Sequence, residues 1–69
     1  MYVRKLLEKF GKKELRNMAV CLHRYFPLVK PSRIYDLMLQ VDSIDKTLHL
    51  LMCHEEMEIT LDEIVFMYL

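Results

Sequence analysis

Apolar residues recur along the chain at the three- and four-residue spacing of an amphipathic α-helix. In the first segment, the positions i, i+3, i+4 and i+7 are occupied by Val3, Leu6, Leu7 and Phe10. This spacing places them on one face of a helix. Gly11, the only glycine, follows at once and suits the left-handed conformation that closes a helix. The pattern therefore predicts a short first helix that ends at Gly11.

A second apolar stripe follows and predicts a second helix. Its members are Leu15, Met18, Ala19, Leu22 and Phe26. Pro27 comes directly after the stripe. Because proline lacks an amide donor and clashes with the preceding turn, we expect the helix to end there.

The third predicted helix begins at Pro31, because proline is tolerated in a first turn. Its apolar positions are Ile34, Leu37, Met38 and Val41, with Tyr35 and Leu39 beside them. Together they cover an arc of about 200° at roughly 100° per residue, so this helix should be central in the fold.

The fourth predicted helix begins after Asp42 or Ser43, since either side chain can cap a helix N-terminus. Its expected core stripe consists of Ile44, Leu48, Leu51 and Met52. The spacing is again that of one helix face.

The last predicted helix has the clearest beginning. Thr60 and Glu63 stand at the spacing of a capping box, and Ile59 and Ile64 at that of a hydrophobic staple. Its expected core stripe is Leu61, Ile64, Val65 and Tyr68. The alternative is a short strand over residues 58–61, because Ile and Thr favour strands. No second alternating run offers that strand a partner.

These segments predict an all-α protein, a compact bundle of four to five short helices in a single domain spanning residues 1–69. A chain of this length buries only about 60% of the surface that its unfolded form exposes. Yet 54% of the residues are apolar. This surplus points to an apolar surface that contacts a partner.

The charged residues divide between the two halves of the chain. Nine of the ten Lys and Arg side chains lie in residues 1–33, and eight of the ten Asp and Glu side chains lie in residues 34–69. The basic helices therefore occupy residues 1–26 and the acidic helices residues 32–69. Such a dipole can steer the positive half toward an anionic partner, dock two copies, or attract the halves to each other.

The basic residues of the first two helices form a candidate surface for polyanions. They are Arg4, Lys5, Lys9, Lys12, Lys13, Arg16 and Arg24. Lys and Arg supply most of the sequence-independent affinity for nucleic acids. The alternative is that these residues form the solvated faces of two amphipathic helices, and the acidic half would repel the same polyanion.

The sequence offers little chemistry. Cys21, His23, His49, Cys53 and His54 lack the spacing of a zinc site, and no phosphate-binding loop or nucleophile elbow is present. We therefore expect no enzyme activity, metal, cofactor or small-molecule substrate. No apolar run approaches the length of about 18 residues that a membrane span needs, and the N-terminus is too charged for a signal peptide. A cytoplasmic location follows as an expectation.

The apolar residues that remain after one stripe is assigned to each helix are the most informative group. They are Leu50, Cys53, Met57, Phe66 and Met67. Methionine adapts to varied partners, and aromatic side chains are enriched in interface cores. We expect these five to form a partner or oligomer interface, with internal packing as the alternative.

The sequence thus predicts a small, non-enzymatic protein–protein interaction module. It would serve as a regulator, an adaptor or a subunit of a complex, and bind itself as a homodimer or another protein. The second hypothesis is a nucleic-acid-binding regulator that uses the basic face of the first two helices.

Overall fold

Four α-helices make up the protein in a computed structural model that describes residues 5–68. They are α1 (Lys5–Tyr25), α2 (Pro31–Val41), α3 (Ile44–Met57) and α4 (Leu61–Tyr68). No strand occurs within residues 5–68, and the segment considered as a strand is the loop that leads into α4. The expected all-α class is therefore confirmed.

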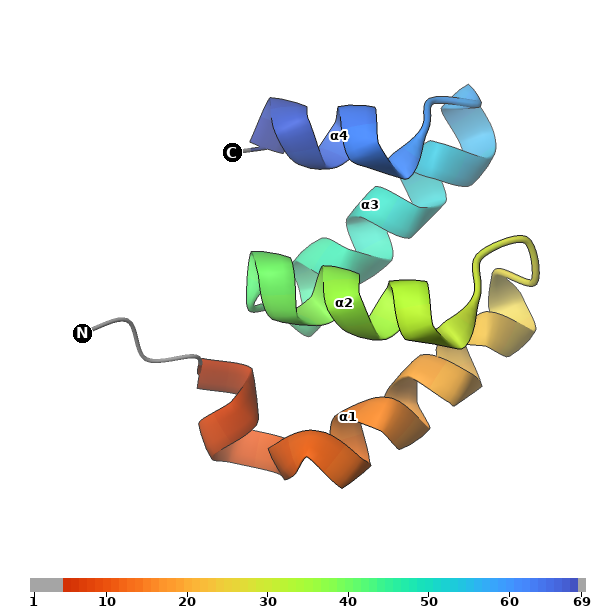
Figure 1. The fold of residues 1–69 in the computed structure, drawn as a ribbon. Helices are drawn as coiled ribbons and strands as arrows, with labels where there is room; N and C mark the ends of the chain where they lie inside the picture. The colour runs from red at the N-terminus through yellow and green to blue at the C-terminus, as the bar shows by residue number, and fades with distance from the viewer. Residues whose placement is uncertain (1–4, 69) are drawn as a thin grey trace.

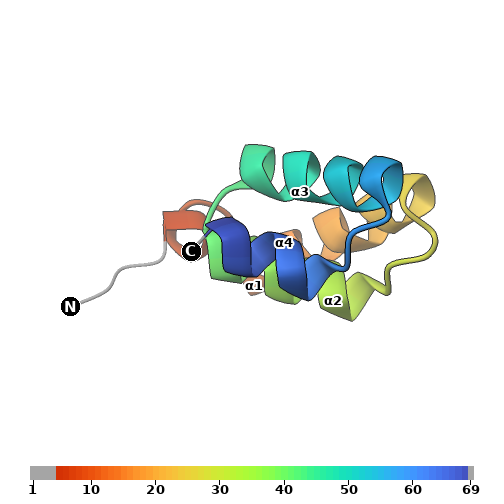
Figure 2. The same cartoon turned by 90° about the horizontal axis from the view of Figure 1, so that it is seen from above.

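The helices follow one another as neighbours in space (Figure 1). α1 packs against α2, α2 against α3, and α3 against α4. α2 and α4 lie on the same side of α3 (Figure 2), which makes the molecule a flat slab. Its Cα atoms extend over 33 × 27 × 16 Å. The short dimension is that of two helix layers whose axes lie about 8–10 Å apart, so every helix keeps one side near solvent.

Two of the interhelical loops lie at the same end of the slab. The chain runs back and forth, so that the α1–α2 loop and the α3–α4 loop both lie at the right-hand end in Figure 1. The α2–α3 corner lies at the opposite end, beside the start of α1.

Gly11 interrupts the helical geometry of α1 and bends it. Its backbone is non-helical, with φ 80 and ψ 163, in a region that glycine adopts far more readily than residues with a Cβ. A second helical segment starts directly after this residue and runs to Tyr25. The two segments agree with the predicted first and second helices, and counted as one kinked helix they give four helices within residues 5–68, inside the predicted range of four to five.

The helix ends on either side of the α1–α2 loop lie where the prolines predict them. α1 ends at Tyr25, and the amide of Phe26 still donates to Leu22 O at 3.0 Å. Pro27 then stops the helix. Pro31 occupies the first turn of α2, where its missing amide hydrogen leaves no bond unmade.

Ser43 is the residue that caps α3. Its hydroxyl accepts from the amide of Lys46 at 3.2 Å. At α4, Thr60 Oγ1 likewise accepts from the amide of Glu63 at 3.2 Å. Each bond satisfies one of the amides that a helix start leaves without a partner. These two predicted caps are therefore confirmed.

Asp42, the alternative cap for α3, serves a different helix. Its backbone is left-handed, with φ 52, and its amide donates to Met38 O to close α2. Its carboxylate accepts from the amides of Lys5 and Leu6, each at 3.0 Å. Asp42 therefore closes α2 and caps the start of α1, which ties the α2–α3 corner to the beginning of the chain.

The hydrophobic core runs through the slab and draws on all four helices and the α1–α2 loop. Its buried members are Leu6, Leu15, Ala19, Val29, Ile34, Leu37, Met38, Leu50, Leu51, Leu61, Ile64 and Val65. Ile59 packs against this core, as its predicted staple position requires. Val3 and the side chain of Tyr68, both assigned to core stripes, lie outside the described residues.

The buried face of α3 is rotated relative to the predicted one, of which Leu51 is fully buried and Ile44 packs against the core. Thr47, Leu50 and Leu51 are fully buried, whereas Met52 of the expected stripe is 50% exposed. With the half-buried His54, the buried positions fall at i, i+3, i+4 and i+7. The true core face is rotated because two of its four positions are polar.

Local hydrogen bonds make those polar residues compatible with burial. Thr47 Oγ1 donates to Ser43 O at 2.7 Å, one turn earlier, and His54 Nδ1 contacts Ile59 O at 2.5 Å. A buried polar group costs little once it is hydrogen-bonded. Hydropathy alone therefore points to the wrong side of this helix.

Candidate interaction surfaces

The five residues predicted as an interface do not lie together. Leu50 is fully buried in the monomer core, so its assignment to a surface is corrected. It was left over in the sequence only because the core face of α3 was misplaced. Cys53 is half-buried and packs against the core. Met57, Phe66 and Met67 are well exposed.

Phe66 and Met67 form the main apolar surface of α4. They are 82% and 72% exposed, while Leu61, Ile64 and Val65 of the same helix are buried. A shallow depression is bordered by Phe66, Met67 and the two acidic residues one turn before them, Asp62 and Glu63. We call these four residues the α4 surface.

Exposure of this pair runs against the usual placement of such side chains. Burial of a Phe or Met side chain is worth about 1.5–3 kcal/mol relative to leaving it in water. Among the described helices, α4 makes extensive contact only with α3. Nothing within residues 5–68 covers its outer side, so the α4 surface is open to a partner.

Met57 stands apart from the α4 surface. It is 62% exposed and ends α3, next to the loop that precedes α4. Phe66 and Met67 lie in the second half of α4, and an eight-residue helix is about 12 Å long. The predicted interface is thereby reduced to Phe66 and Met67, with Met57 beyond the opposite end of α4.

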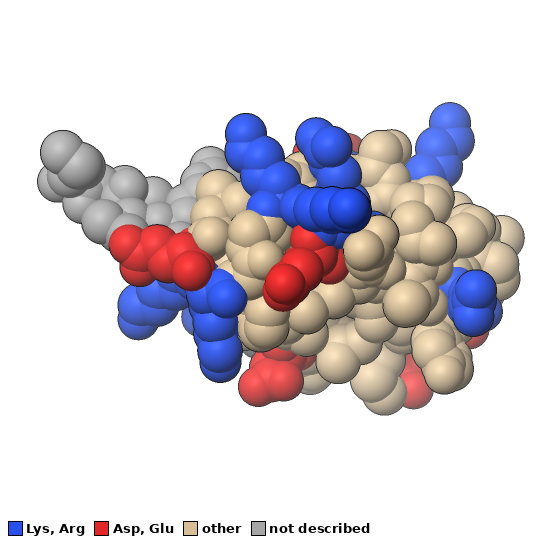
Figure 3. All heavy atoms as spheres, turned by 90° about the horizontal axis from the view of Figure 1, so that it is seen from below, with Lys and Arg blue, Asp and Glu red and all other residues tan. Residues whose placement is uncertain are grey.

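The predicted cations of α1 are all exposed where the structure describes them. They are Lys5, Lys9, Lys12, Lys13, Arg16 and Arg24, which we call the α1 basic face. Arg4, the seventh predicted member, lies outside the described residues. Figure 3 shows many Lys and Arg side chains standing out from this side of the molecule, with Asp and Glu groups among them.

Two members of the α1 basic face also contact aromatic rings. Lys9 Nζ lies 5.4 Å from the ring centre of Phe10, and the Arg16 guanidinium lies 5.7 Å from that of Tyr35 on α2. Both distances fit a cation–π interaction. Arg16 therefore also contributes to the α1–α2 contact.

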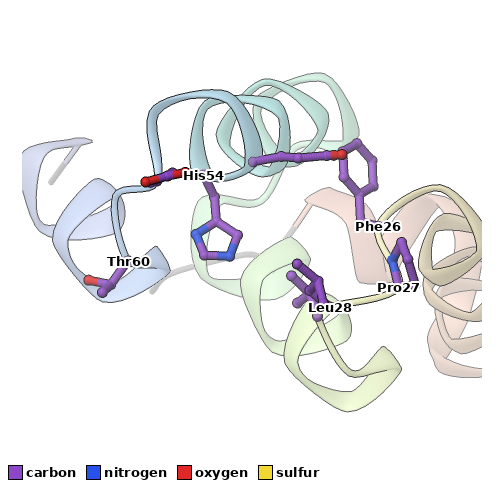
Figure 4. A pocket seen from close by; sticks show the side chains of 8 residues that line it. Phe26, Pro27, Leu28, His54 and Thr60 are labelled. Atoms are coloured by element: carbon purple, nitrogen blue, oxygen red, sulfur yellow. The ribbon is translucent and has the colours of Figure 1, made fainter.

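A hollow of about 420 Å³ lies between the two loops, and no pattern in the sequence predicts it. One wall comes from the α1–α2 loop, with Phe26, Pro27, Leu28 and Val29. The other comes from the end of α3 and the following loop, with His54, Glu55, Glu58 and Thr60. In Figure 4 the His54 ring reaches from α3 into the space between Thr60 and Leu28. We call this hollow, together with a second one that adjoins it past His54, the loop groove.

The loop groove continues past His54. A second hollow of about 350 Å³ shares Leu28, Val29, His54 and Thr60 with the first and extends to Lys30, Arg33, Leu61 and Asp62. The Arg33 guanidinium forms an ion pair with Asp62 at this far end. The first hollow is thus lined by the acidic Glu55 and Glu58, and the second by Lys30 and the Arg33–Asp62 ion pair.

Two histidines hold the loops that form the groove. His23 Nδ1 lies 2.7 Å from Val29 O, and His54 Nδ1 lies 2.5 Å from Ile59 O. Because a carbonyl only accepts, each ring must carry its proton on Nδ1 and donate it. Both histidines are half-buried and belong to the structure of the loops.

The Cys and His residues do not assemble into a metal-binding cluster among residues 5–68. Cys53 Sγ lies 3.7 Å from His49 Nε2, one turn away on α3. Cys21 is on the exposed side of α1, and both cysteines are free thiols.

No protein-family model, curated protein or solved structure matches the chain. Within the part of the chain that the structure describes, no helix has both the length and the apolar character needed to cross a membrane. The function must therefore be inferred from the surfaces themselves.

Proposed function

We propose that the protein is a small, non-enzymatic protein–protein interaction module that self-associates through the α4 surface. It would act in the cytoplasm, where thiols such as those of Cys21 and Cys53 stay reduced, as a regulator, an adaptor or a subunit of a complex. The observation that carries the proposal is the exposure of Phe66 and Met67, side by side on the terminal helix.

The charges beside this pair restrict how two copies can meet. Asp62 and Glu63 lie in the first turn of α4, and Phe66 and Met67 lie one turn later. In a two-fold symmetric contact the same surface meets itself. An antiparallel arrangement of the two α4 helices would keep the acidic first turns apart and bring the apolar pairs together, so we propose that arrangement.

The test is the mass of the protein in solution, measured over a range of concentrations. Truncation of an interface anchor costs about 2 kcal/mol or more in binding, whereas a substitution on a free surface changes stability by about ±0.5 kcal/mol. We expect Phe66→Asp and Met67→Asp to give a helical species of lower mass than the wild type.

Tyr25→Asp is the matched control, because Tyr25 is 75% exposed at the end of α1, away from α4. Its variant should keep the mass of the wild type. A wild-type protein that stays monomeric at high concentration would contradict self-association. Met57→Asp shows whether the contact extends beyond α4 to the end of α3.

The second candidate function is nucleic-acid binding through the α1 basic face. It is supported by the exposure of all six cations, none of which forms an ion pair with another of the residues 5–68. Such free Lys and Arg side chains can neutralise phosphates and release counterions.

The experiment for this second function is binding to duplex and single-stranded nucleic acid at low salt. If it holds, the affinity falls steeply as salt rises, with a slope that reflects the number of phosphates contacted. Replacement of Lys13, Arg16 and Arg24 together by Glu should then abolish binding and leave the helical content intact. Absence of wild-type binding even at low salt would rule this function out.

A further inference from the structure

We propose that the loop groove binds an extended peptide segment of another protein, with an apolar side chain seated between the loops and a basic residue beside it. This site is separate from the α4 surface, since neither Phe66 nor Met67 lines it. It does not require self-association.

The apolar part of the groove comes from the α1–α2 loop. Leu28 is 91% exposed, the highest value of any large apolar side chain in the described chain. Val29 beside it is buried and belongs to the core, so the groove has a fixed floor next to an exposed apolar rim. An apolar anchor that enters such a pocket is the usual centre of a protein interface.

The shape of the groove favours an extended chain over a compact ligand. Its two hollows, of about 420 and 350 Å³, adjoin each other, because four residues line both, and together they reach from Phe26 and Glu55 to Arg33 and Asp62. Peptides that bind in extended form lie along such grooves and place alternate side chains into them.

The charges along the path select the sequence of the peptide. Glu55 and Glu58 are exposed at the first end and have no ion-pair partner within residues 5–68. Lys30 is exposed near the other end, where Arg33 is already paired with Asp62. Complementarity therefore requires a Lys or Arg at the first end, an apolar residue in the middle and an acidic residue toward Lys30.

His54 adds a specific polar contact in the middle of the groove. Its Nδ1–H is donated to Ile59 O, so the neutral ring has Nε2 left as an acceptor. The ring lies between Thr60 and Leu28 (Figure 4). Nε2 can therefore accept from a peptide amide there, which an apolar small molecule would not offer.

The groove also needs little rearrangement to bind. His23 holds the α1–α2 loop through Val29 O, and His54 holds the α3–α4 loop through Ile59 O. Because both walls are fixed in advance, less conformational freedom is lost on binding.

The test uses the full chain and a set of fluorescent synthetic peptides, with binding followed by anisotropy. The central peptide carries adjacent leucines with Lys-Arg on one side and Asp-Glu on the other. One comparison peptide has its leucines replaced by serine, and another has its Lys-Arg replaced by Glu. We expect each comparison peptide to bind at least about tenfold more weakly, a difference of about 1.4 kcal/mol.

Protein variants assign the binding to the groove. Leu28→Asp should weaken binding of the central peptide by about tenfold or more, whereas Tyr25→Asp, at another exposed apolar position outside the groove, should bind it as the wild type does. Glu55→Lys combined with Glu58→Lys should reverse the preference toward the peptide with the Glu flank. Phe66→Asp should leave peptide binding unchanged, which separates this site from the proposed self-association.

Three results would overturn the proposal. The first is that no peptide of the set binds the wild type. The second is that Leu28→Asp binds as well as Tyr25→Asp. The third is that an apolar fluorescent dye binds in a Leu28-dependent way while the peptides do not, which would assign the groove to a small apolar ligand.

Discussion

The two helix pairs of the slab, α1–α2 and α3–α4, are alike at their loops and unlike at their surfaces. In each pair, a histidine near the end of the first helix donates to a carbonyl of the following loop. The α1–α2 pair carries the six cations of the α1 basic face. The α3–α4 pair carries six exposed acidic side chains between Asp45 and Glu63, and the exposed Phe66 and Met67.

The difference between the two surfaces shows which features are part of the packing and which are not. Both pairs bury apolar side chains in the core and hold their loops with a histidine, and neither the sorting of charges nor the exposed pair Phe66 and Met67 is part of that packing. Features that packing does not explain are the ones to examine for function. For this reason the proposed self-association rests on α4 and the nucleic-acid alternative on α1.

The two pairs also differ in how their first and last helices are fixed. α1 is capped from the α2–α3 corner by Asp42, more than thirty residues away in sequence. α4 is capped by its own neighbour, Thr60. The start of the basic helix is therefore capped by a residue distant in sequence, whereas the start of the acidic helix is capped by a residue next to it.

The largest effect should come from Leu50, which is buried in the core of the α3–α4 pair, in contrast to the exposed Phe66. We expect Leu50→Ala to lower the free energy of unfolding by about 2–5 kcal/mol, because it leaves a cavity in the core. Phe66→Ala should change the stability of the monomer by only about ±0.5 kcal/mol. Chemical denaturation of both variants, at a concentration where the protein is monomeric, measures the difference.

The stability of the two variants decides whether core and surface are correctly assigned. If Phe66→Ala destabilises the monomer as much as Leu50→Ala does, then Phe66 is part of the core. The α3–α4 pair would in that case lack the exposed Phe66–Met67 pair on which the contrast with α1–α2 rests, and the contrast would be mainly one of charge.

The parts of the fold that sequence predicts well are set by short-range chemistry. Ser43 and Thr60 cap the helices that follow them, Pro31 begins α2, and Gly11 adopts the positive φ expected of it. Each depends on residues within about one helical turn. At Gly11 the helical geometry is interrupted as predicted, and a second helical segment starts at once, so that the two segments form the kinked helix α1.

The core face of α3 was missed because polar residues share it. Thr47 and His54 satisfy their hydrogen bonds within a few residues of themselves, so they can occupy core positions that hydropathy assigns to solvent. Because hydropathy misplaces this face, it also leaves the buried Leu50 among the candidate interface residues. The backbone partner of a buried Thr or His is not visible in a hydrophobic pattern.

The loop groove and the cap by Asp42 could not be predicted for a different reason. Both bring together segments that are distant in the chain, such as residues 26–30 with residues 54–60. The spacing of residues within one helix says nothing about which loops meet. The feature that the two loops share in the sequence is a histidine five or six residues before the carbonyl that it contacts, His23 before Val29 and His54 before Ile59.

A smaller effect should come from the caps on either side of the α2–α3 corner. We expect Asp42→Ala and Ser43→Ala each to lower the free energy of unfolding by about 0.5–2 kcal/mol, with Asp42 at the upper end because its carboxylate accepts two amides. Asp42→Asn should lower the free energy of unfolding by less than Asp42→Ala does, since its amide oxygen still accepts and Asn tolerates a positive φ.

Hydrogen exchange at single amides distinguishes the two caps. Asp42→Ala should speed exchange at Leu6, and Ser43→Ala should speed exchange at Lys46 but not at Leu6. Equal exchange at Leu6 in the wild type and in Asp42→Ala would mean that the start of α1 does not depend on the corner. The distinction between a tertiary cap for α1 and a local cap for α4 would then fail.

The smallest effect concerns the ion pair that joins the two helix pairs, between Arg33 in the first turn of α2 and Asp62 in the first turn of α4. Their side chains are 43% and 85% exposed, so solvent and salt screen the attraction. We expect a coupling of about 0.2–1 kcal/mol from a double-mutant cycle with Arg33→Met and Asp62→Asn. The cycle is needed because Asp62 also interacts favourably with the amides at the start of α4, and Asp62→Asn alone would include that loss.

The salt dependence of this coupling provides its control. At about 1 M salt the Debye length falls to about 3 Å, so the coupling should largely disappear if it is an exposed ion pair. A coupling well above 1 kcal/mol that persists in high salt would show that Arg33 and Asp62 are desolvated together. In that event the two helix pairs would be locked by a polar contact at the loop end of the slab, and the far end of the loop groove would be closed to a peptide.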